Sequence, residues 1–384
     1  MRVPLLDVRR QNLPIEDQLL DAFRRVVRSG QFILGAEVER FEEQAAALAG
    51  ARFGVGVSSG TDAILVALMA LGIGPGDEVI CPSFTFFATA GCVARVGARP
   101  VFAESCADCF NIDPAGIEPL IGSRTKAIIP VHLFGQAADL EPILAIARRH
   151  HLAVVEDAAQ AFGAEYRGKP VGGWGDFGTV SFFPTKNLGA LGEAGLLVTN
   201  DETLAERARL LRNHGMHPKY YHRMIGGNFR LDAVQAALLA VKLPHLAEYT
   251  AGRQRNACFY QDCLGTLRGG KVGVVTPATH PDRNHIVNQY TVRVRPGAGW
   301  DGTESPRNAL RKYLAVRGIA SEIYYPLPLH AQDCFREFGP HRRLPVAEAL
   351  AEQVLSLPVF PEIAEEERSA VVSAIREFAD ERNG

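Results

Sequence analysis

The sequence carries almost no excess of one charge. Its 384 residues include 41 Lys and Arg against 43 Asp and Glu, so the formal net charge is −2 at pH 7. Recognition of a nucleic acid or an anionic membrane depends on a concentrated positive field. This chain gives no electrostatic argument for either partner, and we expect it to bind neither.

Long apolar runs are also missing. The longest uncharged one, AILVALMALGIG over residues 63–74, is shorter than the roughly 20 residues that a transmembrane helix needs. The first residues, MRVPLLDVRRQNLPIEDQ, contain no apolar core of the kind found in a secretory signal peptide. We therefore expect a cytoplasmic protein without a membrane segment.

Cysteine is scarce and scattered. The seven cysteines are odd in number, which argues against a disulfide framework and suits a reducing compartment. One pair, Cys106 and Cys109, has the spacing CxxC, but a zinc site normally has a second pair and the sequence contains none. We therefore expect no metal.

Segments typical of strands and of helices alternate through the first part of the chain. Short apolar runs indicate strands buried on both faces, over residues 53–57, 78–82, 99–103, 126–132, 152–157, 179–183 and 194–200. Helices are predicted over residues 13–28, 38–49, 62–71, 88–96, 140–150, 203–213 and 231–243. The alternation predicts an α/β fold with a mostly parallel sheet flanked by helices.

The pattern changes at about residue 246. Beyond it we predict a strand over residues 289–294 and helices over residues 306–317 and 348–355. A chain of this length is expected to form two domains. We predict a large α/β domain over residues 1–245, which includes the N-terminal helices, and a smaller α+β domain over residues 246–384.

Lys186 stands in an unusual setting, the stretch SFFPTKNLGALGEAG over residues 181–195. Lysines usually lie on solvated faces, and this one follows apolar residues. A lysine among apolar groups tends to lose its proton, and a neutral amine can form a Schiff base. Ser181, five residues earlier, is either a phosphate ligand or an ordinary strand serine.

Three other segments complement this lysine. VSSGTDA, over residues 57–63, is a strand-to-helix turn whose backbone N–H groups suit a phosphate, although an ordinary N-cap is the alternative. Asp157 ends a buried strand, where it either pairs with a cation such as a pyridinium nitrogen or caps the next helix. PSFTFFATAG, over residues 82–91, offers an aromatic ring for stacking or is plain core. With the lysine, these parts are what pyridoxal phosphate requires.

The same segments resemble a known family, the pyridoxal-phosphate-dependent sugar aminotransferases named after DegT, DnrJ and StrS. The resemblance covers nearly the whole chain, is strongest over residues 30–246, and is most specific in EDAAQ (156–160) followed by SFFPTKNLG (181–189). It implies the fold of aspartate aminotransferase. Two segments depart from the family pattern: GEAG (192–195) replaces GDGG, and AESCADCF (103–110) replaces a more acidic segment.

The resemblance implies a role for each residue around the cofactor ring. Lys186 forms the Schiff base with the cofactor and later moves the proton between cofactor and substrate carbons. Asp157 pairs with the pyridinium nitrogen and keeps the ring an electron sink. Gln160 hydrogen-bonds the ring hydroxyl, and Phe86 stacks on the ring.

The resemblance also assigns the phosphate ligands and an assembly. Gly60 and Thr61 hold the phosphate through backbone and hydroxyl groups, and Ser181 adds a second hydroxyl. Asn228, in GGNFRLD, reaches the phosphate from the neighbouring subunit. The chain is therefore expected to form an obligate homodimer with two composite sites.

The implied reaction moves an amino group from L-glutamate to a keto group of a nucleotide-linked deoxysugar, in amino-sugar biosynthesis. The stretch HGMHPKYYH, over residues 214–222, resembles members that act at carbon 3 of sugars linked to thymidine or uridine diphosphate. The same chemistry at carbon 4 is the alternative. Residues expected to contact the sugar or diphosphate, each with an alternative as surface or core residue, are Lys219, Tyr220, Tyr221, Arg230, Tyr325 and His330.

Three rival functions share parts of this pattern. Sugar dehydratases of the same fold have histidine in place of the lysine, so Lys186 argues against them. A regulator that binds the cofactor without turnover is disfavoured by the intact set of Lys186, Asp157 and Gln160. A decarboxylase or desulfurase of the same fold is disfavoured by the motifs GGNFRLD and SFFPTKNLG.

Overall fold

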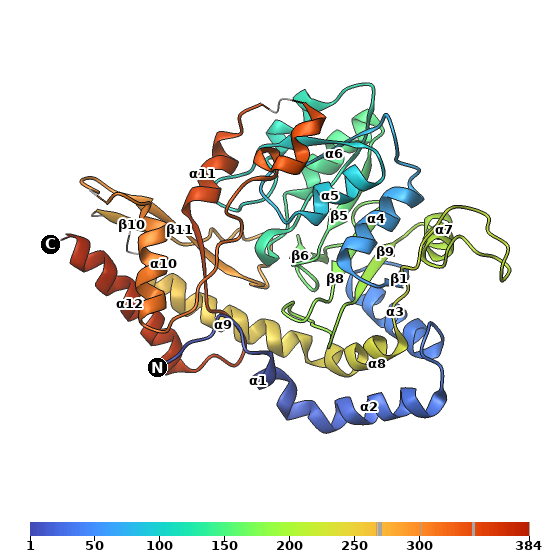
Figure 1. Ribbon diagram of the computed structural model, residues 1–384, viewed down its shortest axis with the longest axis horizontal. Coiled ribbons are helices and arrows are strands. Elements are labelled where there is room, and N and C mark those ends of the chain that lie inside the picture. The colour runs from blue at the N-terminus through green and yellow to red at the C-terminus, as the bar shows by residue number, and fades with distance from the viewer. Residues whose placement is uncertain (266, 268–270, 301, 340–341, 384) are drawn as a thin grey trace.

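The centre of the molecule is a mixed sheet. The computed structural model describes residues 1–265, 267, 271–300, 302–339 and 342–383, and in these ranges seven strands form one sheet in the order β1-β9-β8-β5-β4-β2-β3 (Figure 1). The strands are β1 (Phe53–Val57), β2 (Glu78–Pro82), β3 (Arg99–Ala103), β4 (Thr125–Ile128), β5 (Ala153–Asp157), β8 (Phe177–Ser181) and β9 (Gly195–Thr199). β9 runs antiparallel to β1 and β8, and the other neighbours pair in parallel. The predicted fold class is confirmed.

Helices cover both faces of this sheet. They are α3 (Ala36–Leu48), α4 (Gly60–Ala70), α5 (Ala88–Arg95), α6 (Leu140–His150), α7 (Glu202–Arg212) and α8 (Ala233–Lys242). A short α1 (Val8–Asn12) and α2 (Glu16–Ser29) precede them, and α2 packs against α8. Alternate side chains of a strand point to opposite faces. In β9, Leu197 packs into the core that contains α4, whereas Leu196 and Val198 pack into the core that contains α3 and α8. Burial on both faces explains why these strands are continuously apolar.

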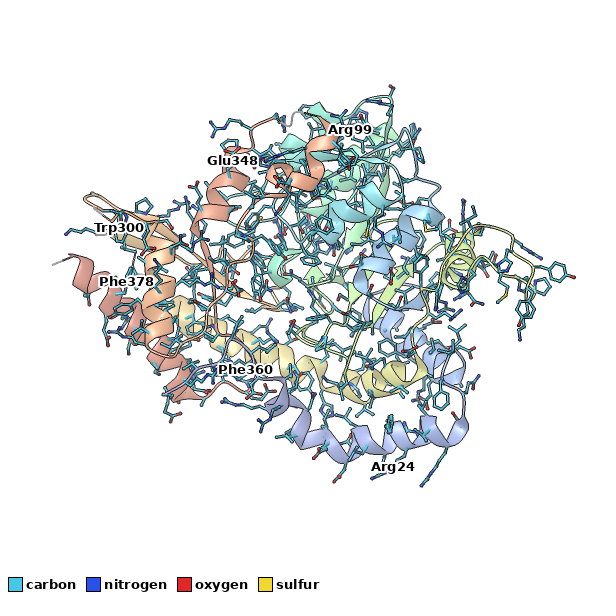
Figure 2. The ribbon with its side chains drawn as sticks, viewed as in Figure 1. Arg24, Arg99, Trp300, Glu348, Phe360 and Phe378 are labelled. Atoms are coloured by element: carbon cyan, nitrogen blue, oxygen red, sulfur yellow. The ribbon has the colours of Figure 1, made fainter. Side chains whose placement is uncertain are left out.

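A second, three-stranded sheet lies towards the C-terminus. Its strands β10 (Val272–Val275), β11 (Tyr290–Pro296) and β12 (Val354–Leu357) pair antiparallel in this order. The remaining helices are α9 (Leu246–Leu264), α10 (Pro306–Val316), α11 (Pro345–Gln353) and α12 (Glu365–Asn383). Phe360 and Phe378 lie in the core of this unit (Figure 2). Throughout the described part of the chain, every helix is too short or too polar to span a bilayer.

The division of the chain at residues 245 and 246 stays a prediction. α9 begins at Leu246, as the change of pattern suggests. The first residues of the chain, however, contact the C-terminal unit. Val3 forms a β-bridge with Ile319, and Arg10 pairs with Glu367 at 2.6 Å.

The predicted helix over residues 348–355 is wrong in its last two residues. α11 ends at Gln353, and Val354 and Leu355 belong to β12, where they pair with Arg293 and Val292 of β11. The backbone N–H and C=O groups along the edge of β11 need hydrogen-bond partners, and β12 provides them. This pairing between distant parts of the chain outweighs the local helical periodicity. The sequence patterns also do not predict α9 or α12.

A buried ion pair connects the helices α3 and α7 to strand β1 of the large sheet. Glu42 of α3 accepts a hydrogen bond from the backbone N–H of Gly56 in β1, 2.7 Å away. Arg212, at the end of α7, contacts the same carboxylate and donates to the carbonyl oxygen of Gly56 at 3.0 Å. Both side chains are buried, so the pair fixes α3 and α7 against the strand that leads into α4.

We expect Arg212→Leu to lower the free energy of unfolding by about 3–5 kcal/mol, because the substitution leaves the Glu42 carboxylate buried and unpaired. The matched control is Arg124→Leu, since Arg124 pairs with Glu78 on the surface and its loss should cost at most about 1 kcal/mol. Denaturant unfolding followed by circular dichroism measures both values. Similar losses for the two variants would contradict the structural role of the buried pair.

Candidate active site

One cavity of about 520 Å³ opens at the carboxyl ends of the central strands. In open α/β sheets this is the edge where ligands bind. The cavity is lined by all the predicted cofactor residues except Asn228, namely Gly60, Thr61, Phe86, Asp157, Gln160, Ser181 and Lys186. The chain thus brings together residues that are separated by more than a hundred positions in the sequence.

The turn from β1 into α4 forms one end of this cavity. Ser59 caps α4 by accepting a hydrogen bond from the backbone N–H of Asp62 at 3.1 Å. The first N–H groups of a helix, here those of Gly60 and Thr61, have no partner within the helix and attract anions. A Cβ atom at Gly60 would lie 2.6 Å from Cβ of Ser181, so glycine is needed for the turn to approach β8. A phosphate group fits this end.

Asp157 lies at the base of the cavity, where it ends β5. Its side chain accepts hydrogen bonds from the Thr89 hydroxyl at 2.8 Å and from the backbone N–H of Ala159 at 3.2 Å. Burial raises the pKa of Asp157, and the hydrogen bond from Thr89 opposes that rise. A cation placed against this carboxylate would favour its ionised form, which a protonated pyridine nitrogen would do.

Lys186 lies in the loop after β8 and reaches the same cavity. Its backbone N–H donates to the carbonyl oxygen of Phe183 at 2.8 Å, which fixes the turn that carries it. Burial lowers the pKa of Lys186 to about 8, while the negative charge of Asp157 acts in the opposite direction. At pH 7 roughly a tenth of an amine with this pKa is unprotonated and therefore nucleophilic.

Gln160, Tyr325 and Phe86 also line the cavity. The amide nitrogen of Gln160 donates to the hydroxyl oxygen of Tyr325 at 3.1 Å. The amide oxygen of Gln160 is buried and has no hydrogen-bond partner in the described residues, so a ring hydroxyl would satisfy it. Phe86 is 55% exposed, which leaves its ring available to a planar ligand in the cavity.

The segment after α7 does not line the cavity. Lys219, Tyr220 and Tyr221 are exposed on a loop that extends away from the sheet (Figure 1). Asn228 is also exposed, and Arg230 donates to the side-chain oxygen of Asn213 at 2.9 Å. The residues that line the cavity within the described chain include none of these five.

His330 and Tyr325, both predicted substrate residues, have different positions. Tyr325 lines the cavity. Nδ1 of His330 lies 2.6 Å from the hydroxyl of Ser83, and its Nε2 lies 3.5 Å from a carboxylate oxygen of Glu348. His330 is not among the described residues that line the cavity, and its predicted contact with substrate remains a prediction.

Several lining residues are absent from the sequence-based predictions. Glu193 lies in GEAG, where the departure from the family pattern was the available signal. Gln289 and Tyr324 come from the C-terminal part of the chain, and no local motif marks them. Thr89, which lies outside the described lining, belongs to the aromatic segment over residues 82–91. The sequence gives no reason to pair it with Asp157.

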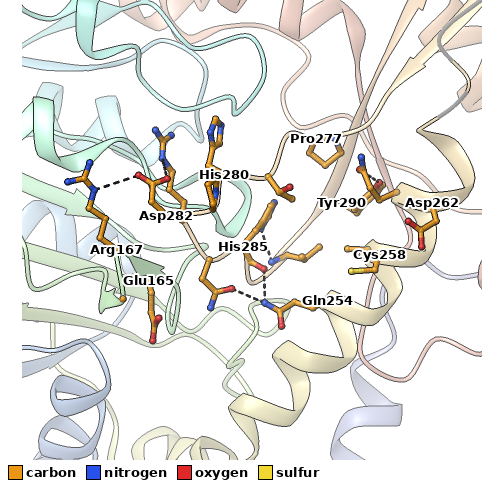
Figure 3. Close-up of a pocket in the computed structure, with 18 residues that line it drawn as sticks. Glu165, Arg167, Gln254, Cys258, Asp262, Pro277, His280, Asp282, His285 and Tyr290 are labelled. Atoms are coloured by element: carbon orange, nitrogen blue, oxygen red, sulfur yellow. Dashed lines mark hydrogen bonds and ion pairs between the residues drawn. The ribbon is translucent and has the colours of Figure 1, made fainter.

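A larger cavity, of about 960 Å³, lies between α9 and the loop before β11 (Figure 3). Gln254 spans part of it by donating to the side chain of Asn284 at 2.9 Å and to the carbonyl oxygen of His285 at 3.0 Å. Burial lowers the pKa of His285 to about 4, so its imidazole is neutral. Among the described residues that line this cavity there is no lysine, whereas Lys186 lines the smaller one.

The smaller cavity fits pyridoxal phosphate at both polar ends of that molecule. The start of α4 would hold the phosphate, and the carboxylate of Asp157 would face the pyridine nitrogen. When bound, the cofactor supplies an electron sink that makes a proton on the neighbouring substrate carbon acidic. Together with the mostly parallel sheet, this site defines a pyridoxal-phosphate-dependent aminotransferase of the aspartate aminotransferase fold.

The family follows from comparison with known sequences. The model of the DegT/DnrJ/EryC1/StrS aminotransferase family matches residues 14–376. The chain belongs to this family.

Similar proteins have two kinds of description. A protein of Geobacillus stearothermophilus, described as a pleiotropic regulatory protein, is 49% identical over 379 residues, which cover 98% of this chain and 99% of that protein. A protein of Acidithiobacillus ferrooxidans, described as UDP-N-acetyl-3-dehydro-alpha-D-glucosamine 3-aminotransferase, is 44% identical over 374 residues, 97% of each chain. The crystal structure of S. venezuelae DesV with a ketimine intermediate has a TM-score of 0.92 and 42% identity, and covers 99% of both chains.

We expect Thr89→Val to weaken the binding of pyridoxal phosphate roughly ten- to a hundredfold, because it removes a hydrogen bond to a buried carboxylate. The pKa of Asp157 would rise further, which favours the neutral acid and weakens its hold on the pyridine nitrogen. Titration of the cofactor, followed by its near-visible absorbance across pH, measures the effect. Thr199→Val is the matched control, because Thr199 is equally buried but donates to the carbonyl oxygen of Asp176. Equal effects in both variants would contradict a role through Asp157.

Proposed function

We propose that the protein transfers the amino group of L-glutamate to the keto group at carbon 3 of a nucleotide-linked deoxysugar, in cytoplasmic amino-sugar biosynthesis. The observation that carries the proposal is one cavity holding Lys186, with its lowered pKa, beside the buried carboxylate of Asp157. The relative from A. ferrooxidans supports carbon 3, because its description names a 3-aminotransferase of a UDP-linked sugar. Uridine and thymidine diphosphates are the nucleotides we propose.

The residues of this chain would divide the work as follows. Asp157 keeps a negative charge at the base of the cavity, which stabilises positive charge on a ring nitrogen. The amine of Lys186 takes a proton from the donor carbon and later returns one to the acceptor carbon. A pKa of about 8 suits both directions, because proton transfer is most efficient when the pKa of the acid–base group lies near the working pH.

The charge of the cavity supports a composite site. Its described lining contains one cation, Lys186, together with the acids Asp157 and Glu193. The cofactor phosphate, a dicarboxylate donor and a diphosphate-linked sugar are all anionic, so further positive charge must come from elsewhere. Lys219 and Arg230 belong to the segment that does not line the cavity of its own subunit. We propose that a partner subunit provides this segment, including Asn228.

An exposed apolar face supports the same assembly. One side of α2 packs inward through Leu19 and Val26. The other side carries Leu20, Phe23 and Val27, which are 43%, 45% and 49% exposed. Apolar side chains gathered on one surface are typical of protein interfaces. We propose that this face of α2 contributes to a homodimer.

The assignment of Lys186 is tested by absorbance spectroscopy. We expect protein with pyridoxal phosphate to show a lysine-dependent near-visible band that L-glutamate discharges, whereas Lys186→Ala shows no such band. Lys242→Met is the matched control and should keep the band. Burial also lowers the pKa of Lys242 to about 8, but its amine donates to the carbonyl oxygen of Gly189 outside the cavity.

The outcomes of this experiment separate the functions. A band that no amino acid discharges would favour a regulator that binds the cofactor without turnover. If glutamate discharges the band, 3-keto and 4-keto sugars linked to uridine or thymidine diphosphate are then offered to the aminated enzyme. Return of the original band with the 4-keto sugars only would overturn the proposal of carbon 3.

Mixed dimers test the composite site. Neither Lys186→Ala nor the double variant Asn228→Ala with Arg230→Ala should be active alone. Their mixture, after reversible dissociation, should regain about a quarter of parental activity, because half of the random dimers are mixed and each holds one complete site. A mixture of Lys186→Ala with Asp157→Asn is the control and should stay inactive, since both residues belong to one subunit. Equal recovery in both mixtures, or none in either, would contradict the proposal.

A further inference from the structure

The loop after β3 contains a closed turn that carries both cysteines of the CxxC motif. A β-bridge between Ser105 and Ile112 closes the turn. Inside it, the backbone N–H of Cys106 donates to the carbonyl oxygen of Asn111 at 2.8 Å, and the N–H of Phe110 donates to the carbonyl oxygen of Cys106 at 3.1 Å. These hydrogen bonds fix the backbone that carries Cys106 and Cys109.

Three donor atoms converge at this turn. A sulfur atom of Cys106, a sulfur atom of Cys109 and a carboxylate oxygen of Asp108 all lie within 4.8 Å of one another. Bond lengths of roughly 2.3 Å to sulfur and 2.0–2.2 Å to oxygen separate the ligands of one zinc ion by about 3–4 Å. A small contraction of the turn would therefore bring all three donors onto one ion.

The three donor residues differ in their exposure to solvent. Cys109 is 3% exposed, Cys106 is partly exposed, and Asp108 is exposed, so the donors run from the interior to the solvent. An ion arriving from solvent can therefore reach Asp108 and Cys106 first, and its binding would release the thiol protons of both cysteines.

The rest of the fold holds the turn from behind. Arg293 of β11, which is buried, donates to the carbonyl oxygen of Ala107. The backbone N–H of Ala278 donates to the carbonyl oxygen of Asp108 at 3.3 Å. Both contacts use backbone oxygens and leave the side chain of Asp108 available for a ligand.

We propose that Cys106, Asp108 and Cys109 bind a divalent cation of the zinc class, with a water molecule in the fourth position. Two thiolates select zinc or cadmium over magnesium or calcium, which prefer oxygen donors. The proposal departs from the expectation from the sequence, because the turn brings a carboxylate beside the one cysteine pair. It does not depend on the aminotransferase reaction.

The site would stabilise the aromatic wall behind the cofactor cavity. The ring of Phe110, next to Cys109, lies 6.4 Å from the ring of Phe84 and 5.4 Å from that of Phe134. Both of these rings contact Tyr325, which lines the cavity. The bound ion is therefore expected to raise the thermal stability of this wall without taking part in the reaction.

Cadmium binding to the full-length, reduced and metal-free protein tests the proposal. Cadmium is the probe because its thiolate complexes absorb in the ultraviolet. We expect one equivalent to bind with this absorption, and zinc to displace it. Cys106→Ser should abolish the absorption, and Asp108→Asn should weaken binding roughly tenfold while keeping both sulfur donors. Because Asp108 is exposed, its variant is expected to fold normally.

Matched controls come from the two exposed cysteines, Cys258 and Cys334. Cys258→Ser and Cys334→Ser should leave the stoichiometry and the affinity unchanged, since both residues lie outside the turn. The proposal would be overturned if the parent bound no cadmium, or if binding persisted unchanged in Cys106→Ser and Asp108→Asn. Loss of the absorption in Cys258→Ser or Cys334→Ser would place the ion elsewhere and would also overturn it.

Discussion

The site depends on a single electrostatic constraint, the burial of the Asp157 carboxylate at the end of β5. A buried acid is tolerated when hydrogen bonds and a nearby cation stabilise its charge. Thr89 and the backbone N–H of Ala159 provide the hydrogen bonds, and Lys186 lies in the same cavity. The opposed pKa shifts of Asp157 and Lys186 have one cause, because burial penalises the charged form of each. The cavity is therefore suited to a cofactor with a protonated ring nitrogen and an aldehyde that reacts with a neutral amine.

The surrounding scaffold keeps the phosphate end of the cavity in place. The buried pair of Glu42 and Arg212 binds to the backbone of Gly56 in β1. Two residues, Ser58 and Ser59, connect that strand to α4, whose first N–H groups would face an anion. Glycine at position 60 then lets the turn contact Ser181 of β8. Together, the ion pair, the strand and the turn hold the phosphate end of the cavity in place.

The predictions succeed where the signal is local. The central strands are buried on both faces, so their apolar runs are visible in the sequence, and most of their bounds agree within a few residues. The helix over residues 348–355 fails at Val354 because β11 recruits that residue as a strand partner. Gln289 and Tyr324 were missed for a related reason. Both residues belong to the C-terminal part of the chain, which folds back to line the cavity. The periodicity of a sequence does not predict such a contact.

The sequence by itself determined the class of chemistry in this protein. Lys186, Asp157 and Gln160 stand in compact motifs whose residue types reflect their immediate surroundings, and such surroundings leave a local pattern. Only the tertiary structure decided which residues share a cavity, paired His330 with Ser83 outside its described lining and left Asn228 exposed. It also brought Asp108 beside the two cysteines of CxxC. Contacts of this kind depend on turns and distant elements meeting in space, and no short stretch of sequence encodes them alone.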